Sequence, residues 1–428
     1  MTRRCLIVSP HFPPSTVAGV HRARHLVKSL PAHGWEPTVI AVDPAFQLEP
    51  LDSELRGLVP PGARIIETGA IPARWTAPFG LRGEIGLRGY FHLRAAIARE
   101  VAAQRPAVVL ITGSPFYPML LAGWIKRRFG VPVILDFQDP WASQEGATRR
   151  RWTKAWLAHR LAVALEPRAM RSAAWVTSVS DRQNADLAER YPWLDRARMS
   201  AVPIGGDPED AAALRAATPH RDEGSEASRT LDFSYVGTAL PRAAPLLTIL
   251  FEGLAMLRET APDLAARIRL RFVGTSNQPG ESSDYRVLAL AVAAGVAELV
   301  SEAPGRVPFL DALRILAGTH AVLMIGSDEP HYTASKIYPG LMSGRPFLSI
   351  FHAESSAHQI LSAAGGGAAL AYQGEEQRER LIAAVSAELA RLVADPASFG
   401  RTDPAAYAAF TADSVAGEFA RIFAASAA

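Results

Sequence analysis

Ser335 and Lys336 stand in a stretch whose residue types could bind a phosphate. Residues 321–351 read AVLMIGSDEPHYTASKIYPGLMSGRPFLSIF, so one apolar run opens the stretch and another closes it. The pattern predicts a strand, a polar loop, a short helix beginning near these two residues, and a second strand. Free backbone N–H groups at a helix start, beside a hydroxyl and an ammonium, favour an anionic ligand. A serine that only caps the helix, followed by a solvated lysine, explains the same residues.

Two carboxylates and a tryptophan follow another apolar run. The run at 131–137 predicts a buried strand, and Asp136, Asp139 and Trp141 lie at or just beyond its carboxyl end. Ligands of open α/β sheets bind at this end of the strands, so the cluster predicts a substrate-facing loop. Asp139 could act there as a base or bind a hydroxyl of the substrate. The alternative is a tight turn, because Asp-Pro is a common turn signal.

Three histidines are candidates for acid–base chemistry. His11 follows the first predicted strand, whereas His331 and His352 lie in the second half of the chain. A single histidine is more often structural than catalytic, and its place after a strand end favours His11 over His352. Gly19 lies beyond His11 in the same loop, where it either contacts a ligand or only relieves backbone strain.

The elements that would position these residues alternate between apolar runs and helical patterns. Strands are predicted at 5–9, 39–42, 108–112, 131–137, 175–179 and 200–204 in the first half, and at 232–236, 268–273, 299–301, 321–325 and 347–351 in the second. Such alternation is typical of doubly wound parallel α/β sheets. The stretch 206–230, with an acidic centre, separates the two patterns and predicts the crossing between two domains.

Length and composition agree with this division and exclude several classes of protein. A chain of 428 residues exceeds what one hydrophobic core usually supports, and 49% hydrophobic with 20% charged residues is typical of globular proteins. A single cysteine excludes a disulfide framework and a cysteine-rich metal site, and it favours a reducing cytoplasm. The net charge of +3 does not indicate nucleic-acid binding, and no apolar run is long enough to span a membrane.

Two stretches combine arginine with aromatic residues. Residues 74–94 read RWTAPFGLRGEIGLRGYFHLR, a mixture that can contact phosphates, sugars or a membrane surface but is also common in exposed loops. Residues 149–160 place Trp152, Trp156 and Leu157 at helical spacing among basic residues. Such a helix can lie on an anionic membrane, yet packing of the tryptophans into the domain is the favoured interpretation.

Several motifs resemble those of family 4-type glycosyltransferases, which have the GT-B fold. The segment VSPHFPPSTVAGVHRARHLVKSL resembles the opening of these proteins, and ILDFQDPW resembles their Asp-Phe-Arg-Asp-Pro-Trp run. SYVG, RFVG, the turn at Arg306-Val307-Pro308 and SKIYPGLMSGRPFLSIF resemble landmarks of their donor domain. The resemblance covers nearly the whole chain and rests on the order and spacing of these motifs.

The resemblance implies a GT-B architecture of two Rossmann-like, doubly wound parallel-sheet domains facing a cleft. It implies an acceptor-side domain at 1–205, a crossing at 206–230, a donor domain at 231–400, and at 401–428 a C-terminal helix packing on the first domain. The implied activity is metal-independent transfer of a sugar, with retention of configuration, from a nucleotide-diphosphate sugar. The expected acceptor is a cell-envelope glycan, a lipid-linked molecule or a small molecule.

The resemblance also bears on cofactors, partners and location. No cofactor, metal or nucleic acid is expected, and the protein is expected in the cytoplasm, with contact to the inner membrane face through 149–160 left open. Two alternatives stay open: a GT-B nucleotide-sugar epimerase, and a non-catalytic partner protein that binds nucleotide sugars.

With the resemblance, individual residues fall into three roles. His11 and Asp139 are the expected catalytic groups. The residues expected on the acceptor are Ser114, Phe116, Asp136 and Trp141. The residues expected to bind the donor are Gly19, Gly237, Thr238, Arg242, Arg306, Glu329, Ser335, Lys336, Ile337 and Tyr338.

The chain departs from the family pattern in the part of the site that binds sugar and ribose. Family members usually carry two glutamates eight positions apart, where this chain has His331 and Pro339. Glu329, close to the first of these positions, is the candidate substitute. The arginine that usually follows the strand–glycine motif of the donor domain is Thr238 here. The phosphate part of the site, in contrast, matches the family.

Overall fold

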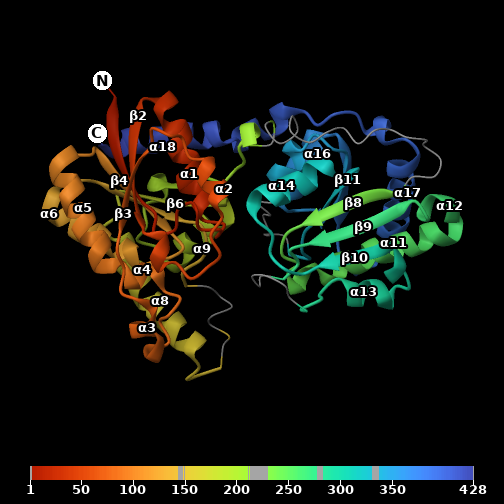
Figure 1. Cartoon of the computed structure of the whole chain (residues 1–428), viewed down its shortest axis with the longest axis horizontal. Coiled ribbons are helices and arrows are strands. Elements are labelled where there is room, and N and C mark those ends of the chain that lie inside the picture. The colour runs from red at the N-terminus through yellow and green to blue at the C-terminus, as the bar shows by residue number, and fades with distance from the viewer. Residues whose placement is uncertain are drawn as a thin grey trace. The chain divides into compact units, whose positions relative to one another are not determined.

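The chain folds into two compact units, each built on one sheet with helices around it (Figure 1). The computed structural model describes residues 2–142, 148, 150–210, 212, 230–276, 283–329 and 337–427. Unit 1 comprises Met1–Ile204 and Ala412–Ala428, and unit 2 comprises Gly205–Thr411.

Unit 1 contains a seven-stranded sheet in the order β3-β2-β1-β4-β5-β6-β7, in which every pair of neighbours is parallel. Helices cover both faces of such sheets, which explains why most of its strands are continuous apolar runs. The strands are β1 (Arg3–Val8), β2 (Trp35–Val42), β3 (Arg64–Thr68), β4 (Val108–Gly113), β5 (Val133–Phe137), β6 (Trp175–Ser178) and β7 (Met199–Ala201).

The helices of unit 1 connect these strands, and the end of the chain adds one more. The α-helices are α1 (Val20–Ser29), α2 (Ser53–Gly57), α3 (Ala73–Thr76), α4 (Ile85–Arg88), α5 (Tyr90–Gln104), α6 (Leu121–Phe129), α8 (Lys154–Met170), α9 (Asp181–Arg190) and α18 (Ala412–Ala427). The 3-10 helices are η1 (Leu30–His33), η2 (Pro44–Phe46), η3 (Ala77–Phe79), η4 (Tyr117–Leu120) and η5 (Arg196–Arg198).

Alternate residues of β1 belong to two different cores. Leu6 and Val8 pack with residues of α5 and α6 on one face of the sheet. Cys5 and Ile7 pack with residues of α1 and α18 on the other face. This is the two-residue alternation of a strand that is buried on both sides. Helix α18 lies beside α1 (Figure 1). Its Phe419 is part of the second core.

Unit 2 contains a six-stranded parallel sheet in the order β10-β9-β8-β11-β12-β13. Its strands are β8 (Leu231–Val236), β9 (Ile268–Val273), β10 (Val300–Ala303), β11 (Ala321–Ile325), β12 (Phe347–His352) and β13 (Gly367–Tyr372). Its α-helices are α11 (Ala244–Thr260), α12 (Pro262–Ala265), α13 (Leu288–Ala293), α14 (Phe309–Gly318), α15 (Ile337–Met342), α16 (Ser356–Ala364) and α17 (Arg378–Ala394). Its 3-10 helices are η7 (Pro241–Ala243), η8 (Ala297–Leu299), η9 (Glu375–Gln377), η10 (Pro396–Phe399) and η11 (Pro404–Phe410).

Two helices of unit 2, α11 and α17, pack closely against each other. Gly253 of α11 permits this approach, because a Cβ atom at that position would lie 2.4 Å from Cγ1 of Val385. Real side chains do not tolerate so short a distance, so the absence of a side chain at this glycine is a packing requirement.

The predicted fold class, two Rossmann-like α/β domains on parallel sheets, is confirmed. All predicted strands are present, and β3 and β13 are additional strands at the sheet edges. Unit 2 ends at Thr411 rather than at the predicted residue 400, because η11 packs against α16 and the ring of Phe410 stacks on that of Tyr338. The C-terminal helix therefore begins at Ala412, not at 401. Most of the predicted crossing at 206–230 lies outside the described residues.

Candidate functional site

His11 and Glu49 form an acid–base pair close to the carboxyl end of β1. Nδ1 of His11 lies 2.7 Å from Oε1 of Glu49, and both side chains keep a small exposed fraction. The Ser15 hydroxyl donates to the same carboxylate oxygen. The backbone holds the two segments together, since Asp52 N donates to the Pro14 carbonyl over 2.7 Å.

The protonation of this pair follows from its surroundings. Burial by itself raises the pKa of Glu49, but the hydrogen bond and charge of His11, with the Ser15 hydroxyl, lower it overall to about 2. Glu49 is therefore ionised near neutral pH and can only accept hydrogen bonds. Nδ1 of His11 must carry the proton that it donates, which leaves Nε2 as the ring nitrogen that does not bond to Glu49. This is the arrangement of a general base oriented by a carboxylate.

The loops after β1, β4 and β5 meet at one edge of the unit 1 sheet. A Cβ atom at Gly19, the residue before α1, would lie 3.0 Å from Oε1 of Gln138 and 3.6 Å from the Ser114 carbonyl oxygen. Gln138 N in turn donates to the Gly113 carbonyl over 2.7 Å. The structure therefore brings together Gly19, predicted to bind the donor, and Ser114, predicted to bind the acceptor.

Asp136 belongs to the interior of unit 1, which corrects its prediction as an acceptor ligand. Its buried carboxylate accepts from Nε of Arg22 over 3.0 Å and from the Thr177 hydroxyl over 2.8 Å. Nε2 of Gln138 donates to it over 3.3 Å. Arg22 is also buried and donates further to carbonyls of the segment 202–203. These partners neutralise and occupy the carboxylate, as a buried charge requires.

Asp139, the predicted catalytic carboxylate, is open to solvent just beyond β5. It makes no hydrogen bond or ion pair with any residue that the structure describes. The protein around it displaces part of the surrounding water, and this desolvation raises the pKa of the Asp139 carboxyl. An accessible carboxyl with a raised pKa is suited to exchange a proton with a substrate.

Phe116 and Trp141, two predicted acceptor residues, lie stacked on each other. Their ring centroids are 5.4 Å apart and their planes differ by 10°. The ring of Phe137 also stacks on that of Phe116, with 6.2 Å between centroids, and Tyr117 meets Trp141 edge-on at 6.0 Å. A partly buried aromatic surface with polar groups close by is typical of small-molecule sites.

In unit 2, glycine-containing loops after β8, β9 and β10 converge. Gly237 has a φ of 131° and Gly274 a φ of 74°, both in the region that favours glycine. A Cβ atom at Gly274 would lie 3.7 Å from N of Gly237 and 4.0 Å from the Gly305 carbonyl oxygen. Thr238 follows directly, and its carbonyl accepts from the Tyr235 hydroxyl over 2.9 Å. We call Gly237, Gly274 and Gly305 the glycine edge.

Glu302 of β10 holds the loop that follows Gly274 of the glycine edge. It accepts hydrogen bonds from the Thr275 hydroxyl, from Val287 N over 3.0 Å and from Leu288 N over 2.7 Å. These bonds tie the loop after β9 to the start of α13. Hydrogen bonds within unit 2 therefore hold the backbone next to the glycine edge in place.

Arg242 and Glu329, both predicted to bind the donor, form an ion pair over 3.0 Å. Asp328 lies 3.8 Å from the same guanidinium nitrogen, and its N donates to the Arg242 carbonyl over 3.2 Å. The Arg242 side chain is exposed. An exposed guanidinium can exchange a carboxylate partner for a phosphate, which it binds in the same forked geometry. Arg306 lies half-buried between β10 and α14.

The predicted phosphate-binding helix start is not placed. Ser335, Lys336 and His331 lie outside the described residues. His352, at the end of β12, accepts from Glu354 N over 3.2 Å through Nδ1, which is a local turn contact.

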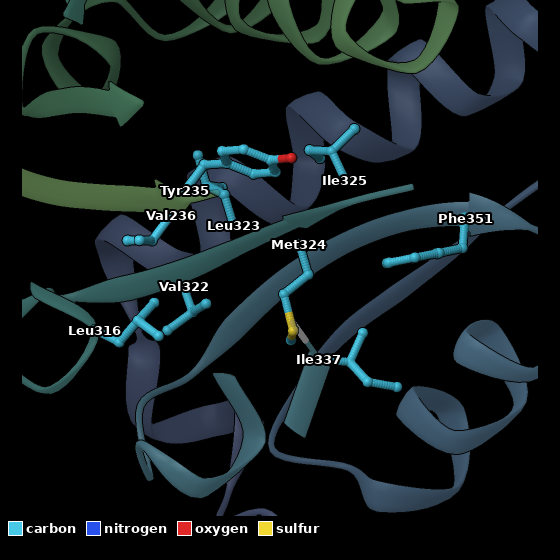
Figure 2. A pocket seen from close by; sticks show the side chains of 9 residues that line it. All are labelled: Tyr235, Val236, Leu316, Val322, Leu323, Met324, Ile325, Ile337 and Phe351. Carbon is cyan, nitrogen blue, oxygen red and sulfur yellow. The ribbon is translucent and has the colours of Figure 1, made fainter. Parts of the chain in front are cut away.

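Strand β11 lines an apolar pocket in unit 2 (Figure 2). Figure 2 shows Met324 and Ile337 on one side of this strand, and Tyr235 and Ile325 on the other. Ile337 and Tyr338, predicted donor residues, are both buried, and burial raises the pKa of the Tyr338 hydroxyl. Their side chains belong to the interior, so donor contacts at these positions are limited to the backbone. The pocket is lined by Tyr235, Val236, Leu316, Val322, Leu323, Met324, Ile325, Ile337 and Phe351.

Two residues of the site, Glu49 and Arg22, were not predicted from the sequence. Glu49 follows Ser15 by 34 residues in the chain, and no motif links the two. The sequence could have indicated the role of Arg22, because a cation on the inward face of a helix requires a buried partner. Among the described residues, no three His, Cys, Asp or Glu side chains are grouped as metal ligands.

A family model matches one part of the chain. Residues 18–205 match the family model of the glycosyl transferase 4-like domain. No curated protein matches the sequence.

Solved structures share the fold over nearly the whole chain. Anabaena HepE, in complex with UDP and glucose, is 14% identical with a TM-score of 0.57, and the match covers 99% of this chain and 100% of that one. A trehalose-6-phosphate structure from E. coli bound with UDP-2-fluoro glucose is 11% identical with a TM-score of 0.62, and the match covers 98% of each chain. WaaG, a glycosyltransferase involved in lipopolysaccharide biosynthesis, is 14% identical with a TM-score of 0.53, and the match covers 98% of this chain and 95% of that one.

These comparisons confirm the predicted architecture and the resemblance to family 4-type glycosyltransferases. The solved structures establish the fold of each unit, while the family match covers residues 18–205, most of unit 1. The chain therefore has the GT-B fold, and its residues 18–205 match a glycosyl transferase 4-like domain.

Proposed function

We propose that this protein is a glycosyltransferase that uses a nucleotide-diphosphate sugar as its donor and that unit 2 binds this donor. The observation that carries the proposal is the glycine edge, because glycines leave the backbone there accessible to a ligand. Arg242 lies at the same edge of the sheet. A diphosphate needs close approach of backbone N–H groups and a cation nearby. Two proteins that share the fold, HepE and the E. coli trehalose-6-phosphate structure, hold UDP or a UDP sugar, which supports this donor class.

The proposed reaction breaks the bond between the anomeric carbon and the diphosphate oxygen. A bond from the acceptor oxygen to the anomeric carbon forms, and a base takes the acceptor proton. Preorganised cations stabilise the charge that grows on the departing diphosphate. We assign this role to Arg242, which exchanges Glu329 for phosphate, and to Lys336 on the basis of the sequence pattern. The transfer is proposed to be metal-independent, so a chelator should leave turnover unchanged.

The acceptor is proposed to bind at the carboxyl edge of the unit 1 sheet. The stacked rings of Phe116 and Trp141 offer an apolar surface, and Ser114 offers an exposed hydroxyl. Asp139 and His11 are the proposed groups for proton transfer. The acceptor class is a hydroxyl-bearing cell-envelope glycan, lipid-linked molecule or small molecule.

Retention of configuration is the outcome that the family resemblance implies, and we propose it here. The His11–Glu49 pair favours a second candidate, inversion, because a single displacement requires a base for the acceptor proton. Proton NMR of the glycoside formed from a donor of known configuration separates the two outcomes. The donor's own anomeric configuration in the product supports retention, and the opposite configuration supports inversion.

Turnover of a panel of nucleotide sugars with a panel of acceptors tests the proposed function. We expect release of a nucleoside diphosphate that depends on an acceptor, and its loss in Arg242→Ala. Arg380→Ala is the matched control, since Arg380 is an exposed arginine of α17 in the same unit. Isomerisation of the donor without acceptor would indicate an epimerase, and binding without turnover would indicate a non-catalytic protein. Either result overturns the proposal.

A further inference from the structure

Three large aromatic side chains of unit 1 are exposed. Trp75 belongs to α3, Phe79 to η3, and Trp152 lies just before α8. Trp152 is 81% exposed, Phe79 is 78% exposed and Trp75 is 66% exposed. The prediction that Trp152 packs into the domain is therefore wrong. Leu157 and Leu161 of α8 are exposed as well. Exposed apolar groups of this size, gathered on one part of a surface, indicate an interaction site.

Two segments far apart in the sequence lie side by side here. A Cβ atom at Gly80, directly after Phe79, would lie 3.4 Å from Cε of Lys154. The rings of Trp152 and Trp156 are 5.3 Å apart. The residues around Phe79 and those at the start of α8 therefore form one continuous surface.

The segment that carries Trp75 and Phe79 is firmly attached to unit 1. Arg88 is buried, and its guanidinium donates to the carbonyls of Ile71 and Phe46, each over 2.8 Å. The backbone adds a bond from Ile71 N to the Arg88 carbonyl over 3.0 Å. The aromatic side chains are thus presented by an anchored segment.

The first turns of α8 are apolar on the side that faces solvent. Leu157 and Leu161 are four residues apart, so they share one face, whereas Ala162 and Glu166 point into the unit. A helix at a water-exposed surface normally carries polar residues on its outer face. Trp152 has a φ of 67°, a strained conformation for a bulky residue. Because its side chain is exposed, packing in the interior does not offset this strain.

The same surface is strongly basic. Residues 73–83 and 150–165 contain no aspartate or glutamate. Its exposed cations form no ion pair with any acid among the described residues. They are Arg74, Arg82, Arg150, Arg151, Lys154 and Arg160. We call these cations, with Trp75, Phe79, Trp152, Leu157 and Leu161, the basic–aromatic face.

We propose that the basic–aromatic face docks on the surface of an anionic lipid bilayer. Indole rings favour the headgroup region, exposed leucines favour the adjoining acyl boundary, and cations favour anionic headgroups. The exposed leucines distinguish this partner from a nucleic acid, which would use the rings and cations only. Among the described residues, no helix combines the length and apolar character needed to cross a membrane.

Flotation of the full chain with vesicles tests the proposal without donor or acceptor. The wild type should bind vesicles of phosphatidylcholine with phosphatidylglycerol, should not bind phosphatidylcholine alone, and should be released by salt. Arg150→Glu/Arg151→Glu should weaken binding by at least about 25-fold, because each cation near an anionic surface contributes about fivefold. Phe79→Ser/Trp152→Ser should weaken it by about tenfold or more, since both rings lose their place at the interface.

Matched variants of unit 2 serve as controls. Tyr285→Ser removes another exposed ring, and Arg380→Glu reverses another exposed charge. Both should bind vesicles like the wild type, and circular dichroism should show all variants folded. Wild-type chain that ignores anionic vesicles, or face variants that bind them unchanged, would overturn the proposal. So would tighter binding of single-stranded RNA than of vesicles, measured by fluorescence anisotropy.

Discussion

Replacing Asp136 by alanine should destabilise unit 1 rather than remove an acceptor contact. The Asp136 carboxylate and the Arg22 guanidinium are both fully buried, with 3.0 Å between Nε and Oδ2. Alanine leaves the guanidinium buried with the carbonyls of the segment 202–203 as its described acceptors. Removing one partner of a buried ion pair in this way costs about 3–5 kcal/mol. Urea unfolding followed by circular dichroism measures this loss.

Two further variants calibrate the measurement. Thr177→Val removes one hydrogen bond of 2.8 Å to the same carboxylate and should cost about 1.5–3 kcal/mol. Arg22→Met/Asp136→Leu replaces both charges by apolar side chains and should recover most of the stability that Asp136→Ala loses.

Asp139→Asn separates a structural role from a substrate role. Asp139 lies in the exposed loop after β5, so this variant should stay within about 0.5 kcal/mol of wild-type stability while turnover falls. If Asp136→Ala kept the wild-type urea midpoint but lost acceptor affinity, Asp136 would be an acceptor ligand. The assignment of Asp136 to the interior would then be wrong.

Three further predictions concern Glu49, Arg242 and Gly253. The folded pKa of Glu49, about 2, lies below its ordinary value of 4.5, so its stabilising contribution is complete above pH 4.5 and is lost as the pH falls toward 2. Glu49→Gln should therefore flatten the dependence of the urea midpoint on pH in this window, and an unchanged slope would contradict the pairing with His11. Arg242→Ala should weaken nucleotide-sugar binding about tenfold in calorimetry, as expected for loss of a charge-assisted contact, whereas equal affinity would remove this residue from the donor site. Gly253→Ala should lower the stability of unit 2 by about 1–3 kcal/mol, because the new methyl meets Val385, and a wild-type melting temperature would contradict the close helix packing.

Apolar runs in the sequence predict most of the strands, because strands in the middle of a parallel sheet are buried on both faces. The bounds predicted for β9 and β11 agree with the structure. β3 and β13 lie at the sheet edges, and their compositions carry less signal: β13 reads GAALAY, and β3 has two isoleucines between polar residues. Edge strands have a neighbour on one side alone, so their sequences are less constrained.

The helix predicted at 149–160 shows a different limit. Thr153 caps α8 by accepting from Trp156 N, so the helix begins at Lys154 and leaves Trp152 outside it. Helical spacing relates side chains to one face only within a helix. The face of Trp152 therefore could not be read from its distance to Trp156 in the sequence.

The sequence predicts which strand ends carry the candidate site, but it does not predict which side chains there contact one another. Asp136 and Asp139 stand three residues apart in one motif, yet one is buried against Arg22 and the other is exposed. That difference depends on a contact across 114 residues of chain. The pairing of His11 with Glu49 is likewise a product of the fold. Lys336, outside the described residues, stays a prediction from the sequence.

Binding of nucleotides to the whole chain tests the donor assignment most directly. Thermal unfolding would be followed with UDP, GDP, ADP and their sugar conjugates. A ligand at about 100 times its Kd adds about 2.7 kcal/mol to the stability of the state that binds it. We predict that at least one of these nucleotides raises the Tm of the wild type, with a smaller rise in Arg242→Ala. A wild-type Tm that no nucleotide changes would contradict the claim that unit 2 binds a nucleotide-diphosphate sugar.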